Sequence, residues 1–202
     1  MITLGITGNI GSGKSSVLNI LRNMGVETYD LDNVAKDFYS TDDKIKEQVL
    51  ATFPSVLSDD NHIDTKKLGK LVFKNLDKLD ALQRIIWPEV KKFIYNKIEK
   101  NSNIIAFEGA VIIEAEWYKL FDFIWVIESS YKLSKKRVEK QRNLSETNFE
   151  IILNNQLKTD QVKNILNQDK INYSIINNNS DLNSLKKLIE KESKNFQYIG
   201  EK

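Results

Sequence analysis

Hydrophobic residues along this chain fall into two patterns, short continuous runs and longer stretches with helical spacing. The short runs predict five strands, at residues 2–7, 27–30, 103–108, 122–128 and 173–177. Helical spacing predicts helices after Gly13 and over 133–142, 145–158 and 182–192. Apolar runs without polar alternation are typical of strands buried on both faces of a parallel sheet. Strands that alternate with helices predict an α/β fold with right-handed crossovers.

The segment 34–100, between the second and third predicted strands, has helical periodicity and no clear strand pattern. Its last apolar stripe, from Ile85 to Ile98, contains Pro88, which predicts an interruption of that helix. A crossover between neighbouring strands needs far fewer residues than this segment holds. We therefore predict a helical subdomain inserted into the sheet domain.

The amino-acid composition excludes several classes of function and of site. The 202 residues include 30 basic and 28 acidic ones, and a net charge of +2 argues against nucleic-acid binding by bulk charge. The chain has no cysteine and one histidine, which excludes a cysteine zinc site, a thiol nucleophile and a histidine-rich metal centre. No run of about 18 apolar residues predicts a membrane span, and the N-terminal residues lack a signal pattern. We expect a cytoplasmic monomer or weak homo-oligomer, without nucleic-acid or membrane partners.

Residues 8–15, Gly-Asn-Ile-Gly-Ser-Gly-Lys-Ser, match the phosphate-loop pattern G-x-x-x-x-G-K-[ST]. They follow a predicted strand and open a predicted helix, the context in which backbone N–H groups and the helix N-terminus bind phosphate. Lys14 is expected to reach the β- and γ-phosphates of ATP, and the Ser15 hydroxyl to bind Mg²⁺. The predicted nucleotide-binding residues of this segment are Gly8, Gly11, Ser12, Gly13, Lys14, Ser15 and Ser16.

A phosphate loop indicates a nucleotide but not a reaction. A GTPase should carry Asn-Lys-x-Asp, and the nearest match, Asn96 to Glu99, ends in Glu within an amphipathic helix. A motor or transporter ATPase would need a longer chain and a coupling partner. A small kinase needs an acceptor pocket, a base and a lid, and this sequence offers candidates for all three.

Asp30 and Asp32 are the candidate acceptor-binding carboxylates. Residues at i and i+2 of a strand share a face, so both would point into the crevice at the carboxyl end of the sheet. One of them could accept the proton of the acceptor hydroxyl. The alternative is that an aspartate here only caps the next helix.

Motifs along nearly the whole chain, in order, resemble those of the dephospho-coenzyme A kinase family. The phosphate loop has the family form G-x-I-G-S-G-K-[ST] and is followed by Asp30-Leu31-Asp32 and Ala35. The later matching segments are Ile63-Asp64 with Leu68-Gly69 and Val72-Phe73; Leu82 to Pro88; Glu108 with Ile112, Ile113 and Glu114; and Ser145-Glu146 with Leu153 and Gln156.

The resemblance implies a P-loop NTPase fold, a three-layer α/β/α domain with a five-stranded parallel sheet. It implies transfer of the ATP γ-phosphate to the 3′-hydroxyl of dephospho-coenzyme A, with Asp32 as general base. Residues 1–33, 101–128 and 171–202 would form the nucleotide-binding core. Residues 34–100 would form the coenzyme-binding subdomain, and 129–170 the lid.

The sequence departs from the family pattern at four places. Trp87 replaces a His before Pro88, Thr65 replaces an Arg, and Ala110 replaces a Pro. Gln141-Arg142-Asn143 stands in place of Arg-Asp-Gly, so Arg142 is the expected lid arginine displaced by one position. Trp87 is retained as a candidate acceptor contact.

Four further residues carry open alternatives. Arg137 and Arg142 lie in a basic stretch that could neutralise phosphoryl charge or be a solvated face. Glu108 could hold Mg²⁺ through water, orient the acceptor or be an ordinary strand end. Asn178 could approach adenine or belong to a polar turn. Alternative functions are a nucleoside or nucleoside-monophosphate kinase and a non-catalytic nucleotide-dependent regulator.

Overall fold

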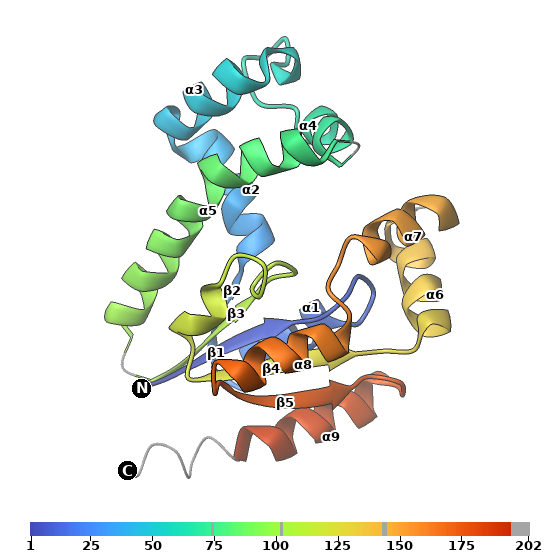
Figure 1. Cartoon of the computed structure of the whole chain (residues 1–202). Helices are drawn as coiled ribbons and strands as arrows, with labels where there is room; N and C mark the ends of the chain where they lie inside the picture. The colour runs from blue at the N-terminus through green and yellow to red at the C-terminus, as the bar shows by residue number, and fades with distance from the viewer. Residues whose placement is uncertain (74, 102, 143–144, 195–202) are drawn as a thin grey trace. The chain divides into compact units, whose positions relative to one another are not determined.

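A computed structural model describes residues 1–73, 75–101, 103–142 and 145–194 (Figure 1). The chain divides into two compact units. One consists of Met1–Asp30 with Lys100–Lys202, and the other of Leu31–Glu99. The boundary at residue 30 falls directly at the end of a strand, without a linker.

The first unit is built on a five-stranded parallel sheet with the order β2-β3-β1-β4-β5. Its strands are β1 (Ile2–Thr7), β2 (Glu27–Asp30), β3 (Ile104–Glu108), β4 (Phe123–Glu128) and β5 (Asn172–Asn177). All six residues of β1 are buried, as the unbroken apolar run predicted for a central strand. The predicted strands and the α/β class are confirmed.

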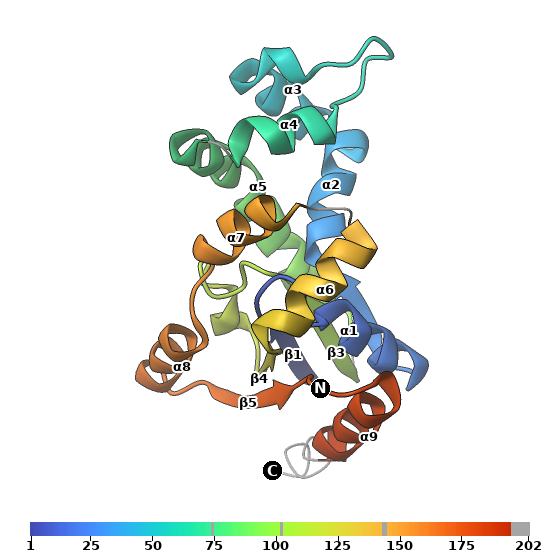
Figure 2. The same ribbon diagram turned by 90° about the vertical axis from the view of Figure 1, so that its right-hand side faces the viewer.

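Helices cover both faces of this sheet. Figures 1 and 2 show α1 (Lys14–Asn23) and α9 (Leu182–Ser193) on one face and α8 (Thr159–Gln168) on the other. Alternate strand residues reach the α1 and α9 face, where Leu4, Ile6 and Trp125 pack with Leu21 and Ile189. This unit is therefore the three-layer α/β/α domain that the sequence predicted.

The helical segment after β4 differs from its prediction. It contains α6 (Tyr131–Arg142) and α7 (Glu146–Asn154), the latter capped by Ser145, whose hydroxyl accepts from the Asn148 N–H. The single helix predicted over 145–158 is wrong, because α7 ends before Asn155 and the chain then starts α8 at Thr159. Consecutive asparagines are poor helix formers, and this pair ends the helix.

The second unit is helical, as predicted for the insertion. Its elements are α2 (Leu31–Thr41), α3 (Asp43–Thr52), the short 3₁₀ helix η1 (Pro54–Val56), α4 (Thr65–Val72) and α5 (Leu76–Glu99). The interruption expected at Pro88 is wrong, since α5 continues through it with Pro88 on an exposed face. No helix of the described residues, α5 included, has the length and apolar character to cross a bilayer.

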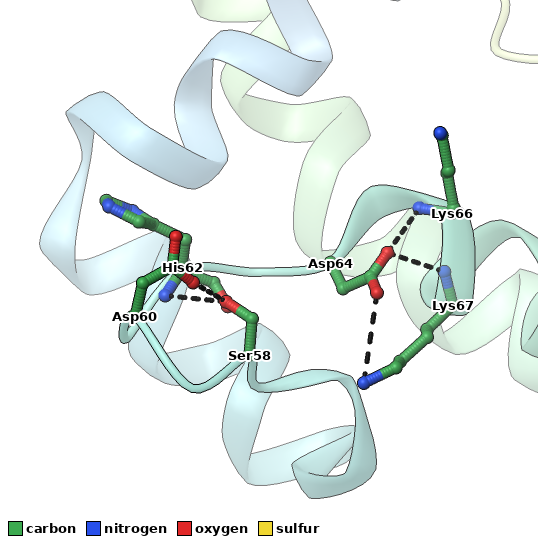
Figure 3. Close-up of polar contacts among 6 residues, drawn as sticks. All are labelled: Ser58, Asp60, His62, Asp64, Lys66 and Lys67. Carbon is green, nitrogen blue, oxygen red and sulfur yellow. Dashed lines mark hydrogen bonds and ion pairs between the residues drawn. The ribbon is translucent and has the colours of Figure 1, made fainter.

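The Ile63-Asp64 segment of this unit has a structural role (Figure 3). Asp64 caps α4, because its carboxylate accepts hydrogen bonds from the N–H groups of Lys66 and Lys67, both at 2.9 Å. These bonds lower the pKa of Asp64, chiefly the one from Lys67. Ile63 is buried and forms an isolated β-bridge with Leu57. The segment orients α4, and the neighbouring His62 is exposed.

Candidate active site

The phosphate loop spans the turn between β1 and α1, in the context that its motif requires. Gly8, Gly11 and Gly13 have φ angles of 143°, 75° and 98°. At Gly13 a Cβ atom would lie 2.1 Å from Nδ2 of Asn178, so a side chain is excluded by space as well as by conformation. The glycines thus let the loop turn closely against its neighbours.

Lys14 lies within this loop. Its Nζ donates to the carbonyl oxygen of Gly8 at 2.9 Å and lies 3.9 Å from Oε1 of Glu108. The side chains of Lys14 and Glu108 are only 10% and 5% exposed. A buried ammonium beside the loop is placed to attract an anion held by the loop amides.

The side chains of Glu108 and Ser15 lie together beside the loop, and each offers an oxygen that can bind a metal ion. Glu108 ends β3 and lies in register with Ile6 of β1 and Asp30 of β2. The Ser15 hydroxyl donates to Oε2 of Glu108 over 3.4 Å. Hydroxyl and carboxylate oxygens are ligands that Mg²⁺ prefers, so the donor set fits this ion.

The prediction that Asp30 and Asp32 share a strand face is wrong. β2 ends at Asp30, and Leu31, which is 2% exposed, begins α2. Asp32 therefore lies in the first turn of α2, where a carboxylate complements the positive end of the helix. The helix starts directly after the strand because Leu31 is buried there. Side-chain directions therefore follow the strand repeat at Asp30 and the helical repeat at Asp32.

Arg137 and Asn178 form a hydrogen-bond network with the carbonyl oxygens of the loop. The Arg137 guanidinium donates to the Ser129 hydroxyl and to the Asn178 carbonyl oxygen, both at 3.0 Å. It also lies 3.4 Å from the carbonyl oxygens of Gly11 and Ser12. Asn178 is 4% exposed, and its Nδ2 donates to the Ser12 carbonyl at 2.8 Å. Burial lowers the pKa of Arg137, but a guanidinium stays charged at neutral pH.

These contacts add a structural role for both residues, and their predicted roles toward ATP stay predictions. The Asn178 amide is already engaged by the loop on one side and by Arg137 on the other. Arg137 belongs to α6 but holds loop carbonyls. Arg142 ends α6, and its side chain lies outside the described part of the structure. Trp87 is half-buried in α5 of the other unit.

A cavity of about 300 Å³ opens beside the loop. Its lining combines polar residues of the loop and the start of α1 with three apolar side chains, Val138, Leu182 and Leu185. Its lining residues are Gly11, Gly13, Lys14, Ser15, Ser16, Arg137, Val138, Asn178, Ser180, Leu182 and Leu185. Such a lining offers polar groups for phosphates and apolar side chains for a base, as a nucleotide requires.

Several contacts of the loop could not be predicted from the sequence, apart from the spacing of the family motif that includes Gln156. Gln156 accepts a hydrogen bond from the Ile10 N–H at 2.8 Å, although the two residues are 146 positions apart. Leu182 and Ser180 line the cavity from the segment after β5. Contacts of this range follow from the fold and are not visible in local periodicity.

The sheet order, the loop at its central strand and the Lys14–Glu108–Ser15 cluster define a P-loop kinase. A model of the dephospho-CoA kinase family matches residues 2–184, and the chain belongs to this family. The dephospho-CoA kinase of Fusobacterium nucleatum is 33% identical over 195 residues, which cover 95% of this chain and 96% of that protein.

Solved structures agree in fold. TT1252 from Thermus thermophilus is similar with a TM-score of 0.78 and 23% identity, over 96% of this chain and 97% of that one. Dephospho-CoA kinase from Campylobacter jejuni is similar with a TM-score of 0.65 and 21% identity, over 96% of each chain. The family resemblance noted in the sequence is confirmed.

Proposed function

We propose that this protein transfers the γ-phosphate of ATP to the 3′-hydroxyl of dephospho-coenzyme A. The observation that supports the proposal best is the cluster of Lys14, Ser15 and Glu108 at the phosphate loop. It joins a phosphate-binding cation to oxygen donors for Mg²⁺, which phosphoryl transfer needs. Membership of the dephospho-CoA kinase family supports the choice of acceptor.

ATP would occupy the cavity beside the loop. The loop amides and the N-terminus of α1 would bind the β-phosphate, and Lys14 would leave the Gly8 carbonyl to contact the transferred group. Adenine would lie against the apolar side chains of Leu182 and Leu185 in this cavity. Arg137 and Asn178 also line this cavity, and they would keep the loop in shape by binding its carbonyl oxygens. The contacts with phosphate and adenine that the sequence suggested for them stay predictions.

Ser15 and Glu108 would hold Mg²⁺ in this arrangement. The ion, when bound, neutralises charge on the phosphates. Glu108 is 4% exposed, and in that setting a carboxylate needs a cation nearby, which Lys14 supplies in part. The protein's own contribution is to keep the hydroxyl and the carboxylate together at the end of β3.

The acceptor would be bound by the unit Leu31–Glu99, with Trp87 among its contacts. Asp32 would accept the proton of the 3′-hydroxyl, and Asp30 would orient the sugar. The helices α6 and α7, with Arg142, would close over the phosphates as a lid narrower than the predicted 129–170. We expect the enzyme to act in the cytoplasm as a monomer or weak homo-oligomer.

An acceptor panel tests this proposal. Purified protein with Mg-ATP would be offered dephospho-coenzyme A, adenosine, AMP, CMP or shikimate, and ADP release would be followed with product mass. Only dephospho-coenzyme A should gain a phosphoryl group at an appreciable rate. A preference for AMP or CMP would instead identify a nucleoside-monophosphate kinase. ATP binding without ADP release for any acceptor would indicate a regulator.

A further inference from the structure

The segment between α7 and α8 lies against the phosphate loop. Oε1 of Gln156 accepts a hydrogen bond from the Ile10 N–H at 2.8 Å. The next N–H, that of Leu157, donates to the carboxylate of Glu114. Gln156, Leu157 and Glu114 line a narrow crevice together with Gly8 and Asn9 of the loop. The segment is thus bound on one side to the loop and on the other to the chain after β3.

The side chain of Ile10 extends the contact to α6 and α7. Ile10 is 4% exposed and forms an apolar cluster with Val138 of α6 and Phe149 of α7. Ile152 and Leu153 of α7 pack against the same cluster. Ile10 is therefore the loop residue whose side chain is buried among these helices while its N–H is bound by Gln156.

The loop needs such an outside partner. Glycines at positive φ lose much conformational entropy when they are ordered, so the loop amides do not hold their arrangement alone. Arg137 and Asn178 bind the carbonyl oxygens at the Ser12 end of the loop. Gln156 provides the corresponding contact at the Ile10 end, and it occupies an N–H that would otherwise have no partner among the loop's hydrogen bonds.

We propose that Gln156 is a positioning residue that holds the phosphate loop in its ATP-binding conformation, while Ile10 couples the loop to α6 and α7. The inference rests on the proposed function, in which this loop binds ATP and these helices form the lid. It assigns Gln156 no contact with the substrate. Its effect reaches ATP through the Ile10 N–H and the loop backbone.

Gln156→Met tests the proposal, because methionine has a similar shape but lacks the strong acceptor. We expect the dissociation constant and the KM for ATP to rise about tenfold, the effect of one lost hydrogen bond, while the KM for dephospho-coenzyme A stays within about twofold. The amide of Ile10 should lose protection from hydrogen exchange. In Gln156→Glu, which keeps an acceptor oxygen, the Ile10 amide should remain protected.

Gln161→Met is the matched control. Oε1 of Gln161 also accepts one backbone N–H at 2.8 Å, that of Lys158, but this hydrogen bond caps α8. It should lower the urea midpoint at least as much as Gln156→Met and leave the KM for ATP unchanged. Equal effects of the two variants on ATP binding would overturn the proposal, as would an Ile10 amide that stays protected in Gln156→Met.

The two hypotheses fail differently. If wild-type protein phosphorylates no dephospho-coenzyme A, the proposed function is wrong, and calorimetric ATP binding and Ile10 exchange still decide the role of Gln156. If wild-type protein is active and Gln156→Met binds ATP as tightly as wild type, the proposed function stands and the positioning role is wrong.

Discussion

Lys14 shows how one buried charge can serve both folding and chemistry. Its ammonium is satisfied by the Gly8 carbonyl and by Glu108, so the site is stable without a substrate phosphate. Lys14→Ala should lower kcat by roughly 10²–10³-fold, because the lost charge would stabilise the transferred phosphoryl group in the transition state. Steady-state ADP release measures this, with Lys187→Ala on the exposed side of α9 as control. Retention of more than about a tenth of the activity would remove Lys14 from the mechanism.

The two aspartates after β2 should differ in kinetic effect. Asp32→Asn keeps the shape of the side chain but cannot take a proton, so kcat should fall by roughly 10²–10⁴-fold with little change in the KM for ATP. Asp30→Asn should be milder, because the role proposed for Asp30 is only to orient the acceptor. Initial rates at saturating ATP compare the two variants, and a larger loss at Asp30 would reverse the assignment.

The residues of the candidate site could be predicted where a sequence motif contains them. They could not be predicted where the site forms by contact between distant segments. The loop pattern located Lys14 and Ser15 beside each other at the start of α1. Glu108 could be named as a candidate for Mg²⁺ or for the acceptor, but its contacts with Lys14 and Ser15 depend on strand pairing that local sequence does not show. The partners of the loop carbonyls, Arg137 and Asn178, lie more than a hundred residues away from it, so no local pattern could indicate their contact.

At the scale of elements, the prediction was accurate for strands and less so for helices. Buried parallel strands are continuous apolar runs, which a sequence displays directly. Helix ends depend on capping and on tertiary contacts, so the break at Asn155 and the passage of α5 through Pro88 were both missed. The change from β2 to α2 between Asp30 and Asp32 has the same cause, because burial of Leu31 is a tertiary effect.

Helix α6, which we propose as part of the lid, carries two neighbouring cations whose effects can be compared. Arg142→Ala should reduce kcat with a smaller effect on dephospho-coenzyme A binding, since a lid arginine would contact phosphate mainly after closure. Lys140→Ala, on the exposed part of α6, should stay within about twofold of wild type. Side-by-side kinetics decide between a lid residue and a solvated charge. Equal, small effects would place Arg142 with the solvated charges.

Glu114, after β3, should make stability depend on pH. Partial desolvation of its carboxyl group, on a residue that is exposed overall, raises its pKa against the opposing effects of backbone hydrogen bonds and of Lys14. The folded state therefore binds the proton more tightly than the unfolded chain, and this stabilisation is complete below the ordinary carboxyl pKa and lost as pH rises through the raised one. Glu114→Gln should thus gain stability relative to wild type as pH rises through that window. Urea unfolding at a series of pH values measures the difference, and a constant difference would contradict the shift.

At the scale of the whole molecule, the sequence indicated a helical insertion, and the structure separates Leu31–Glu99 from the rest of the chain. The separation falls at residues 30 and 99, whereas the periodicity suggested 34 and 100. A boundary without a linker has no composition signal, because no glycine- or proline-rich stretch marks it. Where a strand passes directly into a helix, the boundary between two units can be recognised only from how each unit packs.

We propose different ligands for the two units, so each ligand should slow hydrogen exchange in its own unit. A non-hydrolysable ATP analogue with Mg²⁺ should slow exchange in peptides covering residues 8–16 and α6, because binding to the native state suppresses local opening there. Dephospho-coenzyme A should slow exchange within Leu31–Glu99, whose proposed role is to bind the acceptor. Lys14→Ala should lose most of the first effect and keep the second, which separates a binding defect from misfolding. If dephospho-coenzyme A protects only peptides of the sheet unit, the acceptor site does not lie on the helical insertion, and Trp87 is excluded as a contact.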